Sequence, residues 1–370
     1  ANQIIFSLIF IFTSFNAGAT AMIARYFGEK NYPRLNKVFG MNVSLNIVIA
    51  IFATFFSFMF AEQIMSILDM EPEVLEMSIS YFKIVSLGQI FLFFSFAAAA
   101  SLRGVSDTKT PMIITAIANL INTVGNYVLM TGFAFFPQLG MDGAAVATTI
   151  SRIIAALLYL RILLKGRNHL RLSFKNLRLE SKIFKTLWNL SYTAGLEQVF
   201  MQFSFLASGL FVSYLDTTAE ATYRILLNIE SLALMPAIGL GIGASALVGR
   251  ALGEKDKEKA FKTGYISGVL GVSWGILIGS LFLIFPGLTV RIFSDDINII
   301  EYAKSSLLYL AIDQPFLAFV VIISSALRGA GDTRTIMILN ALRQWGGVVP
   351  LCYWLIMYTN TGVKSVWFAE

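Results

Sequence analysis

The chain is a succession of long apolar stretches separated by short polar ones. Within each stretch apolar residues occupy every side of a helix, which predicts buried helices and not the alternating strands of a membrane barrel. About 20 such residues are enough to cross the hydrocarbon of a bilayer. Ten stretches reach this length: 3–27, 36–60, 76–102, 111–131, 142–165, 183–214, 218–250, 259–285, 300–327 and 335–358. We therefore predict an all-α integral membrane protein.

Two phrases occur twice at one spacing. LRGVSDTKT (102–110) returns as LRGAGDTRT (327–335), and GATAMIARYFGEKN (18–31) returns as GASALVGRALGEKD (243–256). Both pairs are 225 residues apart, so the two halves share one plan.

This spacing predicts two repeats of six helices. The stretch 183–214 has no partner, because its counterpart would precede residue 1, and the counterpart of 142–165 would begin near the end of the chain. We thus expect twelve helices in full, of which about ten are present here.

An even number of helices per repeat makes the repeats parallel, with two lobes around a central cavity. The expected organisation is an N-lobe at 1–164 with helices 2–6 of the full protein, a cytoplasmic linker at 165–182, and a C-lobe at 183–370 with helices 7–11 and the start of helix 12.

Composition and charge agree with a membrane location. Apolar residues make up 56% of the chain and charged residues 14%, with a mean hydropathy of +0.72. Five connections hold 21 of the 28 Lys and Arg residues: 25–37, 103–109, 161–185, 250–262 and 328–334. The positive-inside rule places these connections in the cytoplasm, and the net charge of +6 is a topology signal rather than a nucleic-acid patch. We expect a monomer that spans the cytoplasmic membrane several times.

Enzyme chemistry has no residues to support it. The chain has one cysteine, Cys352, and one histidine, His169, which exclude an internal disulfide and any Cys-based metal cluster. It lacks HExxH, a phosphate-binding GxxxxGK[ST] and a Ser/His/Asp set. We expect neither enzymatic activity nor a cofactor.

The doubled phrase carries an Arg and an Asp in each copy: Arg103 and Asp107, then Arg328 and Asp332. One interpretation is a tight interhelical turn, in which each Asp accepts the free amides of the next helix. The other is a gate, in which each Arg forms a latch to an acid that breaks as the lobes rock.

Glycines near these turns suggest helix stops. Gly104 and Gly329 follow the two arginines, and Gly28 and Gly253 are expected to adopt the left-handed conformation after a helix.

Several phrases together resemble one family. LRGVSDTKTPM, then NLINTVGNYVLMTG and LGMDGAAVATTISR, are similar to multidrug and toxin extrusion (MATE) transporters, as are the second-half phrases LRGAGDTRT and GASALVGRALGEKD. The resemblance covers essentially the whole chain, apart from the first helix and most of the last. It implies a secondary antiporter that exports cationic, amphipathic drugs or toxins in exchange for H+ or Na+.

A flippase for lipid-linked precursors, built on a related two-lobed plan, is the alternative. It would need several arginines in its cavity to bind pyrophosphate, whereas the deepest ionisable residues of the second half are mainly acids. This composition favours cations.

Three acids fall inside apolar stretches, where ionisable groups usually serve a function: Glu197, Asp313 and Glu230. Glu197 is the leading candidate to bind the coupling ion, and members of the family often place a glutamate on this helix. Na+ is considered at Glu197 or Asp313, where Pro315 would free a carbonyl oxygen. Glu197 and Glu230 each have a structural alternative. Glu197 could instead be neutralised by a neighbouring helix for packing, and Glu230 could instead form a salt bridge.

The remaining polar residues at membrane depth are candidates for the substrate cavity: Gln198, Gln202, Gln314, Asn119, Asn122, Asn126 and Arg152. The three asparagines share one helix face and serve either as helix glue or as cavity lining. Arg152 has no evident acid in the first half, so its partner is expected on the absent helix.

Overall fold

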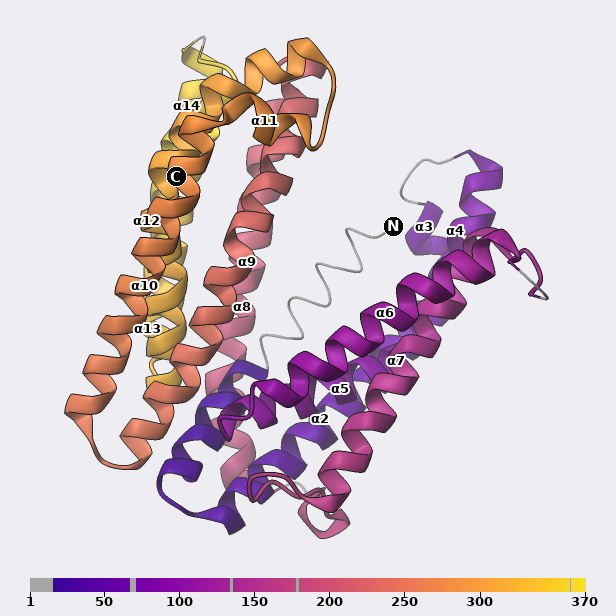
Figure 1. The fold of residues 1–370 in the computed structure, drawn as a ribbon, viewed down its shortest axis with the longest axis vertical. Helices are drawn as coiled ribbons and strands as arrows, with labels where there is room; N and C mark the ends of the chain where they lie inside the picture. The colour runs from indigo at the N-terminus through magenta and orange to yellow at the C-terminus, as the bar shows by residue number, and fades with distance from the viewer. Residues whose placement is uncertain (1–15, 67–70, 134–135, 178–179, 360) are drawn as a thin grey trace. The chain divides into compact units, whose positions relative to one another are not determined.

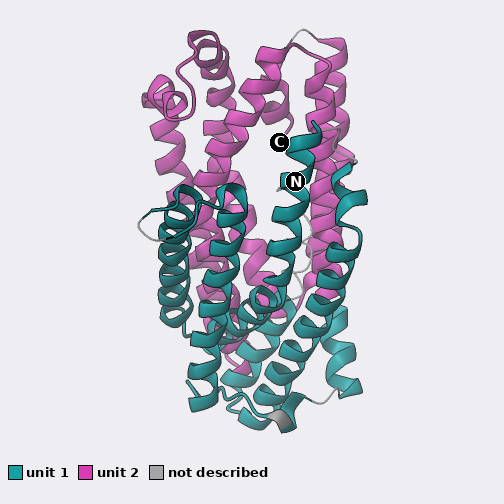
Figure 2. Ribbon diagram, turned by 90° about the vertical axis from the view of Figure 1, so that its right-hand side faces the viewer, with its two compact units in different colours: residues 1–189 teal, residues 190–370 magenta. Residues whose placement is uncertain are grey.

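The computed structural model describes residues 16–66, 71–133, 136–177, 180–359 and 361–370. The chain divides into two compact units, residues 1–189 and 190–370, with the boundary inside one long helix (Figure 2).

The first unit is a bundle of helices (Figure 1). Residues 16–28 are helical. They are followed by α2 (Tyr32–Met59), α3 (Ala61–Ser66), α4 (Pro72–Leu87), α5 (Gln89–Gly104), α6 (Lys109–Thr131), α7 (Gly140–Lys165) and a short 3-10 helix (Phe174–Leu177). Helix α8 (Ser181–Ser213) then leads into the second unit.

The second unit is also helical. Its elements are the rest of α8, then α9 (Thr217–Gly253), α10 (Lys257–Ile284), α11 (Pro286–Arg291), α12 (Ile297–Ala330), α13 (Thr333–Ala341), a π-helix η2 (Leu342–Val348), α14 (Val349–Tyr358) and α15 (Lys364–Ala369). Helix α12 packs against α9 and α10 along much of its length.

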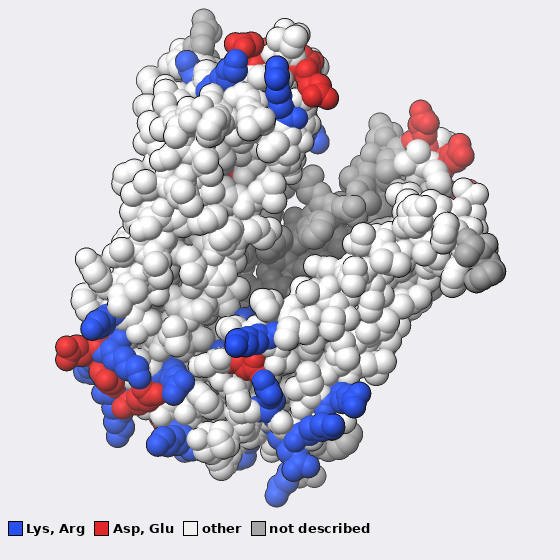
Figure 3. Space-filling model, in the orientation of Figure 1, with Lys and Arg blue, Asp and Glu red and all other residues white. Residues whose placement is uncertain are grey.

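The prediction of an all-α membrane protein is confirmed. Among the described residues, seven helices are long and apolar enough to cross a membrane, or eight if the bent pair α4 and α5 counts as one span. On the face shown in Figure 3, charged side chains gather at the ends of each unit's helices and leave the flanks uncharged. A chain with such apolar flanks spans the membrane several times.

Two predicted spans are interrupted. The stretch 76–102 breaks at Gly88, where α4 and α5 meet at 46°. The stretch 335–358 contains the π-helix, which widens the backbone around Gly346 and Gly347. Apolar content alone does not reveal such breaks, because the residues around them remain apolar.

The described first part of the segment predicted as a linker (165–182), residues 165–177, is folded against the first unit. Asn36 on α2 donates to the carbonyl of His169 (2.9 Å) and accepts from the amide of Arg171 (2.8 Å). Leu170, between these two residues, is completely buried. The compact units divide after Asn189 and not within this segment.

Backbone turns recur at the spacing of the sequence repeat. Lys30 and Lys255 both adopt the left-handed conformation, with φ of 55° and 63°. Ser106 and Gly331 do the same, with φ of 62° and 94°. Each pair is 225 residues apart, so the repeat is present in the local structure of both units.

The two LRG turns end their helices in the same way. The amide of Asp107 donates to the carbonyl of Leu102 (2.9 Å), and the amide of Asp332 donates to that of Leu327 (3.1 Å). This hydrogen bond closes a Schellman motif at the helix end.

The expectation that Gly28 and Gly253 take the left-handed position is wrong, since lysines two residues later adopt it. Gly104 and Gly329 are likewise not left-handed, and they serve close packing. A Cβ on Gly329 would collide with the carbonyl oxygen of Ser245 on α9. A Cβ on Gly104 would lie 3.1 Å from the carbonyl oxygen of Thr20, 225 residues before Ser245.

We expect Gly329→Ala to lower the thermal unfolding temperature of the purified protein, because α9 and α12 would have to separate to admit the methyl group. Overpacking of this kind costs about 1–3 kcal/mol. Gly243→Ala is the matched control, since a Cβ there meets nothing within 4 Å. Equal unfolding temperatures for the two variants would show that the close approach of α9 and α12 is not needed for stability.

Candidate functional site

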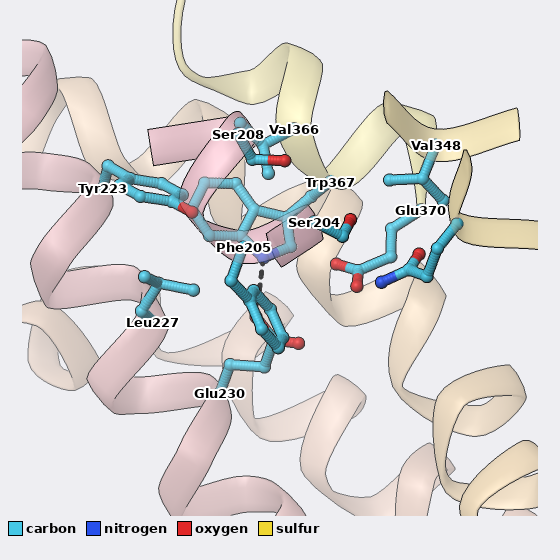
Figure 4. Close-up of a pocket in the computed structure, with 11 residues that line it drawn as sticks. Ser204, Phe205, Ser208, Tyr223, Leu227, Glu230, Val348, Val366, Trp367 and Glu370 are labelled. Carbon is cyan, nitrogen blue, oxygen red and sulfur yellow. Dashed lines mark hydrogen bonds between the residues drawn. The ribbon is translucent and has the colours of Figure 1, made fainter. Parts of the chain in front are cut away.

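Glu230 on α9 lies in a narrow buried pocket of the second unit. Its side chain accepts a hydrogen bond from the indole of Trp367 on α15 (2.9 Å; Figure 4). The pocket lining comprises Ser204, Phe205, Ser208, Tyr223, Leu227, Glu230, Gln344, Val348, Val366, Trp367 and Glu370. The free space suits a water molecule or a small cation and is too narrow for a drug-sized molecule.

A second acid lies near this pocket. Asp313 on α12 is close enough to Glu230 for the two carboxylates to repel, and Glu370 interacts with both. Arg343 is the basic residue that attracts all three acids. Glu230 is buried, and Asp313 and Glu370 are half-buried. Three acids facing one arginine retain excess negative charge when ionised. Such a cluster is stabilised by a proton or a bound cation.

Polar atoms around the acids lack partners. Among the described residues, Asp313 Oδ2, Gln314 Nε2, Gln344 Oε1 and the Tyr223 hydroxyl are buried and form no hydrogen bond within the protein. Buried polar groups are usually satisfied, and those that are not commonly bind water or ions. The unsatisfied atoms therefore mark this region as suited to a hydrated proton or a small cation.

The carbonyl that Pro315 frees is placed elsewhere. Proline at 315 leaves the carbonyl of Ala311 without its helical partner. That oxygen faces α10, where a Cβ on Gly279 would collide with it. It thus packs against a neighbouring helix.

Glu197 on α8 has two polar partners. Its Oε1 accepts a hydrogen bond from Arg328 at the end of α12 (2.6 Å) and another from Asn340 on α13 (2.6 Å). The carboxylate is 9% exposed and the arginine 22%, so the ion pair is largely shielded from water. Both copies of the doubled phrase thus form the interhelical turn of the first interpretation. The second copy also has the Arg–acid pair on which the gate interpretation depends.

The three predicted coupling acids form two clusters. Asp313 and Arg328 are 15 residues apart on α12, which corresponds to about 22 Å along a helix. Glu230 and Asp313 belong to the pocket cluster, and Glu197 belongs to the Arg328 cluster. Gln314 is buried next to Asp313, whereas Gln198 and Gln202 are half-buried on the helix of Glu197.

The predicted asparagine stripe lies on α6 in the first unit. Asn122 donates to Thr148 on α7 (3.0 Å), and Asn126 donates to Asn122 (3.4 Å). Asn119 is exposed. Asn122 thus joins α6 to α7, and Asn126 binds Asn122 from the same helix.

Arg152 has a partner within the described chain. It donates to the carbonyl of Val85 (3.2 Å), and its side chain packs against Gly88 at the break between α4 and α5. Thr149 donates to the neighbouring carbonyl of Ile84 (3.1 Å). The carbonyl of Val85 also accepts from the amide of Gly88 (3.1 Å), so Arg152 shares this oxygen. Arg152 and Thr149 thus join α7 to the end of α4 beside the break. The sequence placed the partner of Arg152 on an absent helix because the first half offers no evident acid.

Asp107, in the first LRG turn, holds three hydrogen bonds. It accepts from the amide (3.0 Å) and hydroxyl (2.8 Å) of Thr110 and from the guanidinium of Arg167 (2.9 Å). Burial opposes ionisation, but these hydrogen bonds outweigh it and lower the pKa of Asp107. Asp332, the counterpart, accepts from the amide of Thr335 (3.1 Å). Arg103 in the first copy is half-buried, and its Nε has no hydrogen-bond partner among the described residues.

We expect Arg167→Gln to destabilise the protein by at most about 1 kcal/mol at neutral pH, since Arg167 is largely exposed. A lowered carboxylate pKa contributes stability above the unfolded pKa near 4, and this contribution is lost as the pH falls through the folded value. The unfolding temperatures of wild type and variant should therefore converge below about pH 4. A difference that stays constant from pH 7 to pH 3 would contradict the role of Asp107.

Several residues of the two clusters were not predicted. Trp367, Asn340 and Arg343 reach the acids from helices distant in sequence. Tyr223 lines the pocket two turns before Glu230 on the same helix, α9. The adjacent polar residues Arg343 and Gln344 inside the otherwise apolar stretch 335–358 were the signal that could have indicated their role.

Comparison with known proteins places the chain in a family. The sequence model of the MatE family matches residues 1–128 and 194–354. The chain belongs to the MatE family. This MatE protein is 27% identical over 368 residues to a probable multidrug resistance protein NorM of Thermotoga maritima, covering 99% of this chain and 79% of the relative. It is 31% identical over 256 residues to the multidrug resistance protein NorM of Burkholderia vietnamiensis, covering 67% and 54%.

Solved structures show the same fold. A MOP superfamily transporter from Pyrococcus furiosus matches this MatE protein with a TM-score of 0.91 at 18% identity, covering 99% of this chain and 81% of that one. A MATE transporter in a bent conformation matches with the same TM-score at 19% identity and the same coverage. The two-lobed fold predicted from the sequence is thereby confirmed.

Proposed function

We propose that this MatE protein is a secondary antiporter of the cytoplasmic membrane, which exports cationic amphipathic compounds in exchange for H+ or Na+ by rocking of its two lobes. The observation that carries the proposal is the cluster of the buried Glu230 with the half-buried Asp313 and Glu370, with Arg343 as its basic partner. The names of the multidrug resistance relatives support the class of transported compound.

The coupling cation is proposed to occupy the pocket cluster. Excess buried negative charge makes the empty cluster unfavourable, so proton or cation binding stabilises it. The narrow pocket admits this ion and excludes the drug, which must bind elsewhere. An ion shifts a conformational equilibrium only through different affinities for the two states. The cluster is formed by side chains from α9, α12, η2 and the end of α15. Movement of these helices relative to one another would change the affinity of the cluster for the ion.

Glu197 and Arg328 are proposed to form a second, exchangeable coupling element. In the described state Arg328 occupies the carboxylate. A proton or cation would compete with Arg328 for Glu197, so ion entry would release the end of α12 from α8. This exchange unites the two roles considered for these residues, ion binding and latching.

Ethidium efflux from vesicles tests the proposal. The purified full chain is reconstituted, and a proton gradient or a sodium gradient is imposed in turn. We expect one gradient to drive ethidium transport against its concentration and the other to have little effect. Transport driven by neither gradient would contradict the antiport proposal, and movement of a labelled pyrophosphate lipid in the same vesicles would favour the flippase alternative.

A further inference from the structure

The cytoplasmic end of α7 carries basic residues that form no ion pair with the described residues. Arg161 and Lys165 lie one turn apart on the last turns of the helix, and both are exposed. Arg171 follows, and its side-chain carbons lie 3.8–3.9 Å from the place of a Cβ on Gly166, the residue after Lys165. Three positive charges thus adjoin at one helix end, over which Figure 3 shows basic side chains.

Nearby acids are already engaged. Arg167 pairs with Asp107 (2.9 Å), and Lys37 pairs with Glu180 (3.1 Å). Within the described part of the chain, Arg161, Lys165 and Arg171 form no ion pair. The negative end of the α7 dipole offsets part of their repulsion. Two like charges one turn apart nevertheless destabilise a helix unless an anion lies between them.

The backbone that carries Arg171 is rigidly placed. A two-residue turn at Asn168 and His169 reverses the chain after α7, closed by hydrogen bonds between Arg167 and Leu170. The side-chain amide of Asn36 on α2 binds the backbone on either side of Leu170. It donates to the carbonyl of His169 and accepts from the amide of Arg171. Leu170 is fully buried. Arg171 is therefore held beside α7 by a neutral side chain.

The basic group ends an exposed apolar face. Ile150, Leu157 and Leu164 are 43%, 56% and 46% exposed and lie on the same face of α7 as Arg161. An exposed apolar face on a membrane-spanning helix contacts hydrocarbon. Arg161 and Lys165 then lie at the depth of the lipid headgroups, on the side that the positive-inside rule assigns to the cytoplasm.

We propose that Arg161, Lys165 and Arg171 form a binding site for the headgroup of one anionic phospholipid of the cytoplasmic leaflet, positioned by Asn36. The phosphodiester lies between the guanidinium and ammonium groups, and the acyl chains lie along the apolar face of α7. Arginine forks and lysine both bind phosphate oxygens well. This site is independent of the coupling chemistry in the second unit.

Native mass spectrometry of the full chain in detergent tests the site, with phosphatidylglycerol and phosphatidylcholine as competing probes. Wild type is expected to retain phosphatidylglycerol in preference. The variant Arg161→Gln/Lys165→Gln/Arg171→Gln is expected to lose about fivefold in affinity per removed charge. The matched control is Lys255→Gln/Lys257→Gln/Lys262→Gln, which removes three exposed charges near α10 and should keep the preference.

Asn36→Ala separates a built site from a generally basic surface, because it changes no charge. We expect it to lose most of the preference for phosphatidylglycerol while remaining monodisperse. Equal losses in the two triple variants, or wild-type binding by Asn36→Ala, would overturn the proposal in favour of diffuse attraction. Displacement of the lipid by an equal concentration of inorganic phosphate would overturn it in favour of a free-anion site.

Discussion

Glu230→Gln is expected to abolish ethidium efflux driven by an ion gradient, down to the level of vesicles without protein, while ethidium binding survives. Glutamine keeps the shape of the side chain and can still accept a hydrogen bond from Trp367 (2.9 Å in the wild type). It removes one negative charge from the cluster with Asp313, so the affinity for a proton or cation falls. Without differential ion binding the gradient cannot bias the conformational equilibrium.

Two variants make this result specific. Glu258→Gln removes an exposed acid on the first turn of α10 and should transport as wild type does. Asp313→Asn should also impair gradient-driven efflux, since it removes the acid that repels Glu230. Wild-type efflux in both Glu230→Gln and Asp313→Asn would falsify the assignment of the ion site to the pocket. Loss of ethidium binding as well would point to an effect on folding or on the drug site.

The sequence predicts the helical membrane fold well because hydrophobic length is a local property. Spans such as 142–165 and 218–250 correspond to α7 and α9 within a few residues. The repeat can also be recognised from the sequence, because a residue and its counterpart adopt the same backbone conformation. Ser106 and Gly331 both adopt the left-handed conformation, so this conformation is kept even when the residue type changes.

Tertiary partners are harder to predict, since they depend on helix rotation and on breaks. Arg152 was assigned to an absent acid because the first half offers no evident one, whereas in the structure it donates to the backbone carbonyl of Val85 beside the break between α4 and α5. The membrane-depth acids were identified individually. Their division into two clusters depends on which faces of α8, α9 and α12 contact one another. The sequences of these helices are apolar on all sides, so they do not predict which faces meet.

Glu197→Gln is expected to lower the stability of the protein by about 3 kcal/mol and to abolish gradient-driven efflux. Removing one partner of a buried ion pair leaves the other charge uncompensated, which costs about 3–5 kcal/mol in proteins. The lower end applies because Arg328 keeps 22% exposure. The unfolding temperature of the detergent-purified protein measures the loss of stability, and vesicle efflux measures the loss of coupling.

The double variant Glu197→Gln/Arg328→Met separates these two effects. Methionine removes the unpaired charge, so most of the stability should return, as buried ion pairs are often replaceable by apolar groups. Efflux should remain absent, because no carboxylate is left to exchange Arg328 for the ion. If the double variant regains transport together with stability, then the pair serves only to hold α8 and α12 together, and coupling belongs to the pocket cluster alone.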